Sequence, residues 1–264
     1  MGWIERMAGG GRRALAATPA CGCPILATFL FLWLGWGTIL ASPVSSHAQV
    51  PPTPAPRYTV VLDAAHGGDD TGGHSSGWTE KDTTLALSVR LRSLLAARGI
   101  AVVTTREDDT NVDRVHRDEL ANHANAQACI SLHASLSGLG VHLFTSSLAP
   151  AQPARIQPWR TAQAPWINRS LGFAGVLNSA LQHAGLNVTL GRTDLPVVDS
   201  MACPAVAIEI SPEGAPDAVG HSASAHSGID SLNDADYQAR VAEAIAAAVI
   251  EWRSAGTSAG AGQP

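Results

Sequence analysis

The sequence lacks an excess of basic residues and carries little charge of either sign. Its 264 residues include 17 Lys and Arg against 22 Asp and Glu, which gives a formal net charge of −5. Binding to nucleic acid depends on a basic surface that displaces counterions from phosphates, and this composition offers none. We therefore expect no nucleic-acid partner. Internal repeats are also absent, and the length fits one globular domain with extensions.

Cysteine is scarce, with four in the whole chain. Cys21 and Cys23 lie near the N-terminus, too far from a Leu-Ala-Gly-Cys pattern after the apolar run to indicate a lipoprotein. Cys129 and Cys203 fall in the part expected to be exported, where a disulfide is permitted. The pattern favours two separate buried thiols on core strands, and a disulfide stays open as the alternative because the sequence gives no Cα separation.

The N-terminal 48 residues are typical of an export signal. Arginines precede an uncharged apolar run at 24–40, and Ser46 and Ala48 fit a small-x-small cleavage site. A retained membrane anchor is the alternative, because the run has roughly the length that spans a bilayer. We predict a signal peptide or anchor at 1–48.

The rest of the chain divides into three predicted parts. Residues 49–57 form a proline-rich linker, 58–254 the catalytic domain, and 255–264 a flexible tail. The protein is expected to be exported, in the periplasm or cell envelope, with membrane contact only through its N-terminal segment.

Apolar strands alternate with amphipathic helices after the linker. The expected strands are 58–64, 99–105, 128–134, 140–146 and 204–211, and the expected helices are 81–98, 112–126, 166–185 and 234–253. In the first helix Leu87, Leu91, Leu94 and Leu95 form one apolar stripe. This order predicts a single α/β domain: a mostly parallel, twisted sheet with helices on both faces.

Polar residues at the ends of these strands are the candidate site. His66 follows the first strand, His133 ends the strand at 128–134, Glu209 lies near the end of the last, and Glu80 precedes the first helix. Ligands of such sheets bind beyond the carboxyl ends of the strands. Two imidazoles and one carboxylate, with a fourth position open to water, make a catalytic zinc set, and the other carboxylate is left to act on the water.

Each residue taken alone has a plainer interpretation. His66 fits a turn histidine, His133 a hydrogen-bonded core histidine, and Glu80, beside Asp82, a favourable charge at a helix N-terminus. Glu209 is harder to explain in this way, because it interrupts the apolar run AVAIEI and a carboxylate there is costly without a partner or a function. Their joint placement favours the site.

Six motifs follow one another in order: VVLDAAHGGDDTG, EKD, TTRED, RDELANHANAQACISLHAS, GVHLF and PAVAIEIS. Over residues 58–252 they resemble the zinc-dependent N-acetylmuramoyl-L-alanine amidases, the class called amidase type 3. The resemblance implies one zinc ion per chain, bound by His66, Glu80 and His133, with Glu209 as the catalytic residue. It also implies hydrolysis of the amide bond between N-acetylmuramic acid and L-alanine in peptidoglycan.

Some positions depart from the family pattern or have weaker claims. Ala65 replaces the usual glycine before His66, which would cost on the order of 1 kcal/mol if the backbone there requires a positive φ. Arg117 is a weak candidate for substrate binding, with an ion pair as the alternative. His74 fits a solvent-facing loop residue, and the proline-rich segment 145–165 is expected either to border the cleft or to cover it.

Two other functions remain open from the residues. One is a catalytically silent domain that binds peptidoglycan or regulates a partner, and the other is a zinc carboxypeptidase acting on stem peptides. The presence of all four inferred groups argues against the silent domain. The sequence shows no separate wall-binding module, so we expect targeting to come from the anchor, from a partner or from the cleft itself. Peptidoglycan and an activator protein are the partners considered.

Overall fold

The computed structural model describes residues 58–213 and 225–260. The predicted leader at 1–48 and linker at 49–57 therefore lie outside the described residues. Within the described ranges, no helix combines the length and the apolar character needed to cross a membrane. The last helix runs to Gly260, beyond residue 254, where the sequence places the end of the domain.

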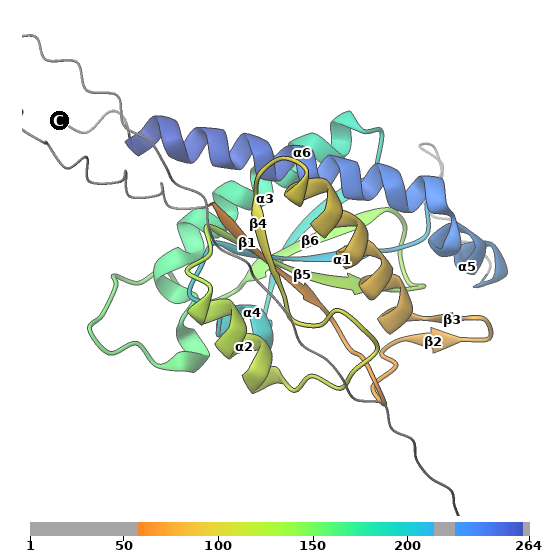
Figure 1. Ribbon diagram of the computed structural model, residues 1–264, viewed down its shortest axis with the longest axis horizontal. Helices are drawn as coiled ribbons and strands as arrows, with labels where there is room; N and C mark the ends of the chain where they lie inside the picture. Colours follow the sequence, from red (N-terminus) through yellow and green to blue (C-terminus); the bar gives the residue numbers. More distant parts are fainter. Residues whose placement is uncertain (1–57, 214–224, 261–264) are drawn as a thin grey trace, which may run out of the picture. The chain divides into compact units, whose positions relative to one another are not determined.

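A six-stranded sheet forms the centre of the fold (Figure 1). Its strands, in spatial order, are β4 (Ala101–Thr104), β1 (Thr59–Ala64), β5 (Ala128–Ala134), β8 (Ala205–Ile210), β6 (Val141–Ser146) and β7 (Val188–Thr193). The first four are parallel to one another, whereas β6 is antiparallel to β8 and parallel to β7. The mostly parallel sheet is confirmed, and β7 is a strand that the sequence did not indicate.

Helices cover both faces of the sheet (Figure 1). One face packs against α1 (Glu80–Ala96), α3 (Ile167–His183) and α6 (Ala235–Gly260) in the larger core. The other packs against α2 (Arg114–His123) and the short α4 (Pro196–Asp199) in a smaller core. The connections hold the remaining elements: β2 (His74–Ser75), β3 (Trp78–Thr79), η1 (Trp159–Thr161), η2 (Ala164–Trp166) and α5 (Ala225–Asn233).

Helix α1 forms where the apolar stripe predicts it and fixes the residue at its start. Leu87, Leu91 and Leu95 are almost completely buried against the sheet. Thr79 caps the N-terminus, its hydroxyl oxygen accepting a hydrogen bond from the backbone N–H of Asp82. The helix therefore begins at Glu80, and its first side chain sits at the edge of the sheet where the parallel strands end.

Cys129 and Cys203 form a disulfide, so the favoured expectation of two separate thiols is wrong. Cys129 lies on β5, and Cys203 lies just before β8, the neighbouring parallel strand. This adjacency brings their Cα atoms to 6.2 Å across a sequence separation of 74 residues. Such a distance is within the range that a disulfide spans.

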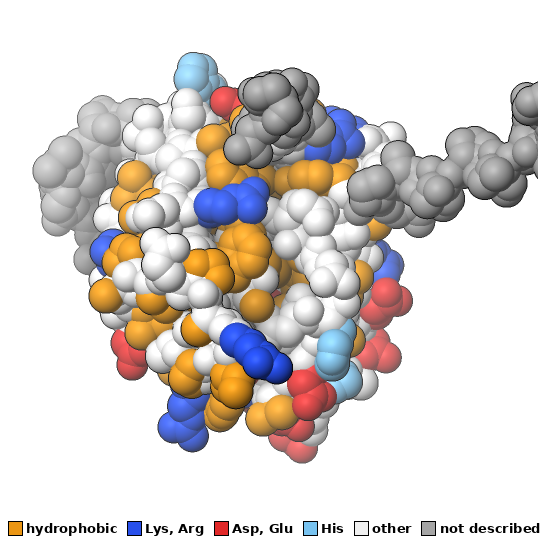
Figure 2. Space-filling view, turned by 90° about the vertical axis from the view of Figure 1, so that its left-hand side faces the viewer, with side chains coloured by type: hydrophobic (Ala, Val, Ile, Leu, Met, Phe, Trp, Pro, Cys, Tyr) orange, Lys and Arg blue, Asp and Glu red, His pale blue; other side chains and the backbone are white. Residues whose placement is uncertain are grey.

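The surface reflects the low content of charged residues. On the face drawn in Figure 2, hydrophobic side chains are scattered among uncharged ones, and charged side chains occur singly or in small groups. The described surface also includes a few exposed large apolar side chains, and two of them, Leu171 and Leu190, line one hollow between α3 and β7. Exposed apolar residues are common on the surfaces of folded domains.

Candidate metal centre

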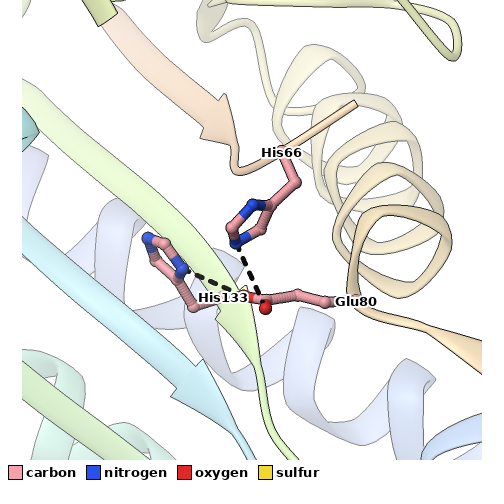
Figure 3. Close-up of side chains that lie close together, drawn as sticks. All are labelled: His66, Glu80 and His133. Carbon is pink, nitrogen blue, oxygen red and sulfur yellow. Dashed lines mark hydrogen bonds and ion pairs between the residues drawn. The ribbon is translucent and has the colours of Figure 1, made fainter. Parts of the chain in front are cut away.

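Three residues distant in the sequence converge at the carboxyl end of the parallel strands (Figure 3). His66 lies in the loop after β1, Glu80 begins α1, and His133 is near the end of β5. One potential ligand atom from each lies within 4.8 Å of the other two. The structure thus brings together the three residues that the sequence singled out as metal ligands.

Glu80 lies between the two imidazole rings. Its Oε2 is 3.1 Å from Nε2 of His66, and its Oε1 is 3.0 Å from Nδ1 of His133. The backbone N–H groups of Gly73 and Ala134 also donate to the carboxylate, at 2.9 and 3.2 Å. These donors fix both oxygens, so the carboxylate cannot rotate freely.

The contacts among these groups shift their proton affinities. Burial by itself would raise the pKa of the Glu80 carboxyl, but hydrogen bonds from the two histidines and from Gly73 outweigh it and hold that pKa well below its usual range. The hydrogen bond with Glu80 raises the pKa of His66 to about 8, against the opposing effect of burial, and Asp70 adds to the rise. A negative charge is therefore held at the centre of the cluster, as a cation site requires.

Glu209 faces the same pocket. It pairs with His133 in the register between β5 and β8, so both side chains project from the same face of the sheet. The pocket has a volume of about 360 Å³. Its lining comprises His66, Gly73, His74, Trp78, Glu80, the segment 133–137 and Glu209. Among the described residues, the side chain of Glu209 has no hydrogen-bond or ion-pair partner, which leaves its carboxylate available to a ligand.

The loop that carries His66 has an unusual backbone. His66 itself adopts a positive φ of 62°, followed by Gly67 and Gly68, also at positive φ. Ala65 does not, so the sequence-based concern about its methyl group does not apply; its N–H instead donates to the carbonyl of Leu132 on β5. Strain at a non-glycine residue persists only where surrounding contacts hold it.

Arg117, on α2, provides such contacts to this loop. Its buried guanidinium donates to the carbonyl oxygens of His66 and Ala64, both at 2.7 Å, and forms an ion pair with Asp63 at 2.6 Å. It is not among the residues lining the pocket. The structure therefore contains the ion pair that the sequence left as the alternative to a substrate contact.

Other residues of weaker standing are also placed. His74 is exposed, as the sequence suggests, yet it lines the pocket and its Nδ1 is 3.2 Å from the carbonyl oxygen of Gly72. The segment 145–165 contributes no residue to this pocket; its Trp159 instead lines a separate hollow beside α2. Sequence reasoning missed Trp78, a buried indole on the pocket wall that donates to the hydroxyl of Thr83 at 2.8 Å.

The fold and this cluster together define an α/β protein with a two-histidine, one-glutamate group at the carboxyl edge of its sheet. That donor set matches the composition of hydrolytic zinc sites. The family model described as N-acetylmuramoyl-L-alanine amidase (Amidase_3) matches residues 60–251. The chain belongs to this family, which confirms the resemblance of its motifs.

Individual relatives agree with this assignment. The chain is 39% identical over 142 residues to an endolysin of Bacillus phage SPP1, a match that covers 53% of this chain and 52% of the endolysin. It is 41% identical over 79 residues to the N-acetylmuramoyl-L-alanine amidase AmiA of Escherichia coli (strain K12), covering 30% of this chain and 27% of AmiA. The matches thus span about half or less of these two proteins.

A solved structure is similar over most of the chain. It is the catalytic domain of CwlV, an N-acetylmuramoyl-L-alanine amidase from Bacillus (Paenibacillus) polymyxa var. colistinus. The TM-score is 0.56 at 26% identity, and the match covers 75% of this chain and 98% of that domain. The sheet and helices described above are therefore an amidase fold.

Proposed function

We propose that this protein is a zinc-dependent amidase that cleaves the bond between N-acetylmuramic acid and L-alanine in peptidoglycan. The observation that carries the proposal is the convergence of His66, Glu80 and His133 on one point, with Glu209 in the same pocket. Membership of the amidase family supports the choice of bond. Export through the N-terminal segment, as a cleaved signal or an anchor, would place the enzyme where its substrate is found.

The three converging residues fit a zinc ion by their chemistry. Imidazole nitrogens and a carboxylate oxygen are standard zinc ligands, and three protein ligands leave one position open. We assign His66, Glu80 and His133 as the ligands of one zinc ion per chain. When bound, zinc supplies a Lewis acid that polarises a carbonyl oxygen and lowers the pKa of water.

Glu209 is suited to move the proton in the reaction. An amide nitrogen does not leave as an anion, so the amino group of L-alanine needs a proton as the bond to the lactyl carbonyl breaks. We assign Glu209 to accept a proton from the attacking water and to deliver it to this nitrogen. Because the carboxylate has no partner among the described residues, no existing ion pair has to break first.

The test is product identity after digestion of purified peptidoglycan with the zinc-loaded full-length protein. We expect mass spectrometry to find free stem peptides that begin with L-alanine, and we expect chelation to abolish their release. Glu209→Gln should keep its zinc and lose most turnover, on the order of 100-fold or more, because amide oxygens do not carry the proton. Glu251→Gln, at an exposed position on α6, is the matched control and should remain active.

Different products would point to the other functions. Release of the C-terminal amino acid from intact stem peptides would identify a carboxypeptidase. Binding to peptidoglycan without any product, by protein with a full complement of zinc, would identify a silent domain. An activator protein stays a prediction, and adding a candidate partner to the same digest would test it.

A further inference from the structure

The ring nitrogen of His66 that does not face Glu80 has a carboxylate partner that the sequence did not indicate. Nδ1 of His66 lies 2.8 Å from Oδ2 of Asp70, while Nε2 faces Glu80. The other oxygen of Asp70 accepts a hydrogen bond from the N–H of Gly72 at 3.0 Å. Since an ionised carboxylate only accepts hydrogen bonds, His66 donates from Nδ1 to Asp70. Its Nε2, which donates to Glu80 in this structure, is the nitrogen left to give up its hydrogen to a metal ion.

His133 is arranged in the opposite sense. Its Nδ1 faces Glu80, and its Nε2 lies 3.4 Å from Oγ of Ser131. The Ser131 hydroxyl donates to Oδ2 of Asp63 at 2.7 Å, so its hydrogen is already committed. Ser131 Oγ is therefore left as an acceptor for Nε2 of His133. Nδ1, which donates to Glu80 in this structure, is then the nitrogen left to give up its hydrogen to a metal ion.

Asp63 is held as an acceptor by its other contacts. It is almost completely buried, and its Oδ1 accepts from Arg117 at 2.6 Å and from Thr105 at 2.8 Å. The carboxylate thus forms an ion pair with Arg117 through Oδ1 and accepts from the Ser131 hydroxyl through Oδ2. Because Arg117 also bonds the carbonyl of His66, one buried network supports both histidines.

We propose that Asp70, on one side, and Ser131 with Asp63, on the other, are positioning residues that hold His66 and His133 in opposite tautomers. With those hydrogens held, the nitrogens that face Glu80, Nε2 of His66 and Nδ1 of His133, are the ones that would bind the proposed zinc ion. The inference rests on the proposed metal site and extends it to residues that do not touch the metal. Outer partners of this kind orient a ligand ring and raise its basicity.

Asp70 permits a clean test because its side chain is 66% exposed and can be changed without disturbing a core. We expect Asp70→Asn to weaken zinc affinity by about 10-fold to 100-fold, measured by competition with a chromophoric chelator. The matched control is Asp69→Asn, the same change at the neighbouring residue, which contacts Asn111 rather than a histidine. Affinity should stay within about twofold of the parent in the control.

Ser131 requires a control for the loss of a buried hydroxyl. We expect Ser131→Ala to lower zinc affinity by about 10-fold, whereas Ser88→Ala, a buried hydroxyl on α1 without a hydrogen-bond partner, should not. The free energy of unfolding of the metal-free variants, measured in parallel, separates lost positioning from lost folding.

A second readout reports the tautomers directly. In zinc-loaded protein labelled with ¹⁵N-histidine, ring correlation spectra should show the N–H of His66 at Nδ1 and that of His133 at Nε2. Finding both at the same ring position would overturn the inference, as would unchanged zinc affinity in Asp70→Asn and Ser131→Ala. Neither measurement uses peptidoglycan, so a failure of the proposed amidase reaction would be distinguishable from a failure here.

Discussion

At the scale of single residues, the absence of a side chain at Gly72 is as important as the ligands. A Cβ built there would stand 2.5 Å from Cδ2 of His66 and 2.7 Å from Oε2 of Glu80. Real Cβ atoms do not approach so closely, so any larger residue would displace one of these two groups. Gly72 also adopts a positive φ of 61°, which glycine tolerates best.

This predicts that Gly72→Ala loses zinc affinity, because the methyl group separates His66 from Glu80. Gly77→Ala is the matched control: its φ is 84°, and no atom lies within 4 Å of the added Cβ. In both variants an alanine at positive φ should by itself lower the free energy of unfolding by about 1 kcal/mol, measured in denaturant. Zinc titration should show weaker binding only for Gly72→Ala, and equal affinities would contradict the steric argument.

Asp118 predicts a pH dependence of stability. Burial raises its pKa to about 6, against the opposing effects of Arg114 and Ser200. The folded protein thus holds a proton on Asp118 at pH values where the unfolded chain has lost it, so this group makes the free energy of unfolding fall as pH rises from about 4 to 6. At pH 7 the folded state carries the full cost of a buried charge.

Asp118→Asn should therefore raise the free energy of unfolding at pH 7.5, by about 1–3 kcal/mol, and by progressively less toward pH 4. Denaturant titrations across this range measure the difference. Glu119→Gln, at the adjacent exposed position on α2, serves as control and should give a small difference that does not vary with pH. A pH-independent gain in Asp118→Asn would show that the charge is not its cause.

The sequence identified the candidate ligands, but it did not identify the residues that hold the ligand rings in place. His66, His133 and Glu209 could be grouped because parallel strands end at a common edge, and Glu80 because it starts the following helix. Asp70 and Ser131 could not be identified, since acidic and hydroxyl residues are frequent in loops and strands and only the fold shows which of them meet an imidazole ring.

At the scale of elements, strong apolar patterns were predictable and weak ones were not. The strands β1, β5 and β8 are buried along nearly their whole length, so their apolar runs stand out in the sequence. β7 is an edge strand with mostly exposed residues and an internal Gly191, so its composition resembles a loop. The strand forms because β6 offers it an unpaired edge, a tertiary cause that no local pattern contains.

The disulfide links β5 to the segment just before β8, at the end of the sheet opposite the site. Closing a loop of 74 residues restricts the unfolded chain, with a contribution of about 4 kcal/mol in the chain-entropy treatment. The free energy of unfolding of the double variant Cys129→Ala/Cys203→Ala, measured by denaturant titration, should therefore be about 2–4 kcal/mol lower than that of the parent. Its zinc affinity should stay near that of the parent. Loss of zinc binding in the folded variant would instead show that the bridge shapes the site.

At the scale of the whole molecule, the metal site ties separate parts of the chain together. Its three residues come from the loop after β1, from α1 and from β5, and they meet only when the sheet has formed. A ligand that binds only the folded state stabilises it. Zinc binding and folding are therefore expected to be coupled.

We predict that zinc raises the thermal midpoint of unfolding, with a gain of about 2.7 kcal/mol when free zinc is 100 times the dissociation constant. Differential scanning calorimetry with and without chelator measures the effect. Glu209→Gln should show the same shift as the parent, because Glu209 is assigned to the proton and not to the metal. His133→Ala should show little or none, and a full shift in that variant would remove His133 from the ligand set.

The sulfur bridge also has a kinetic consequence for the entire domain. Cys129 is 0% exposed and Cys203 1%, so a small thiol reagent must wait for the protein to open before it can attack. At high concentrations of reductant the rate of disulfide cleavage should become independent of that concentration. This limiting rate equals the rate at which the protein opens. Cleavage of this bond therefore reports the rate at which the native protein opens, and the measurement needs no probe attached to the protein.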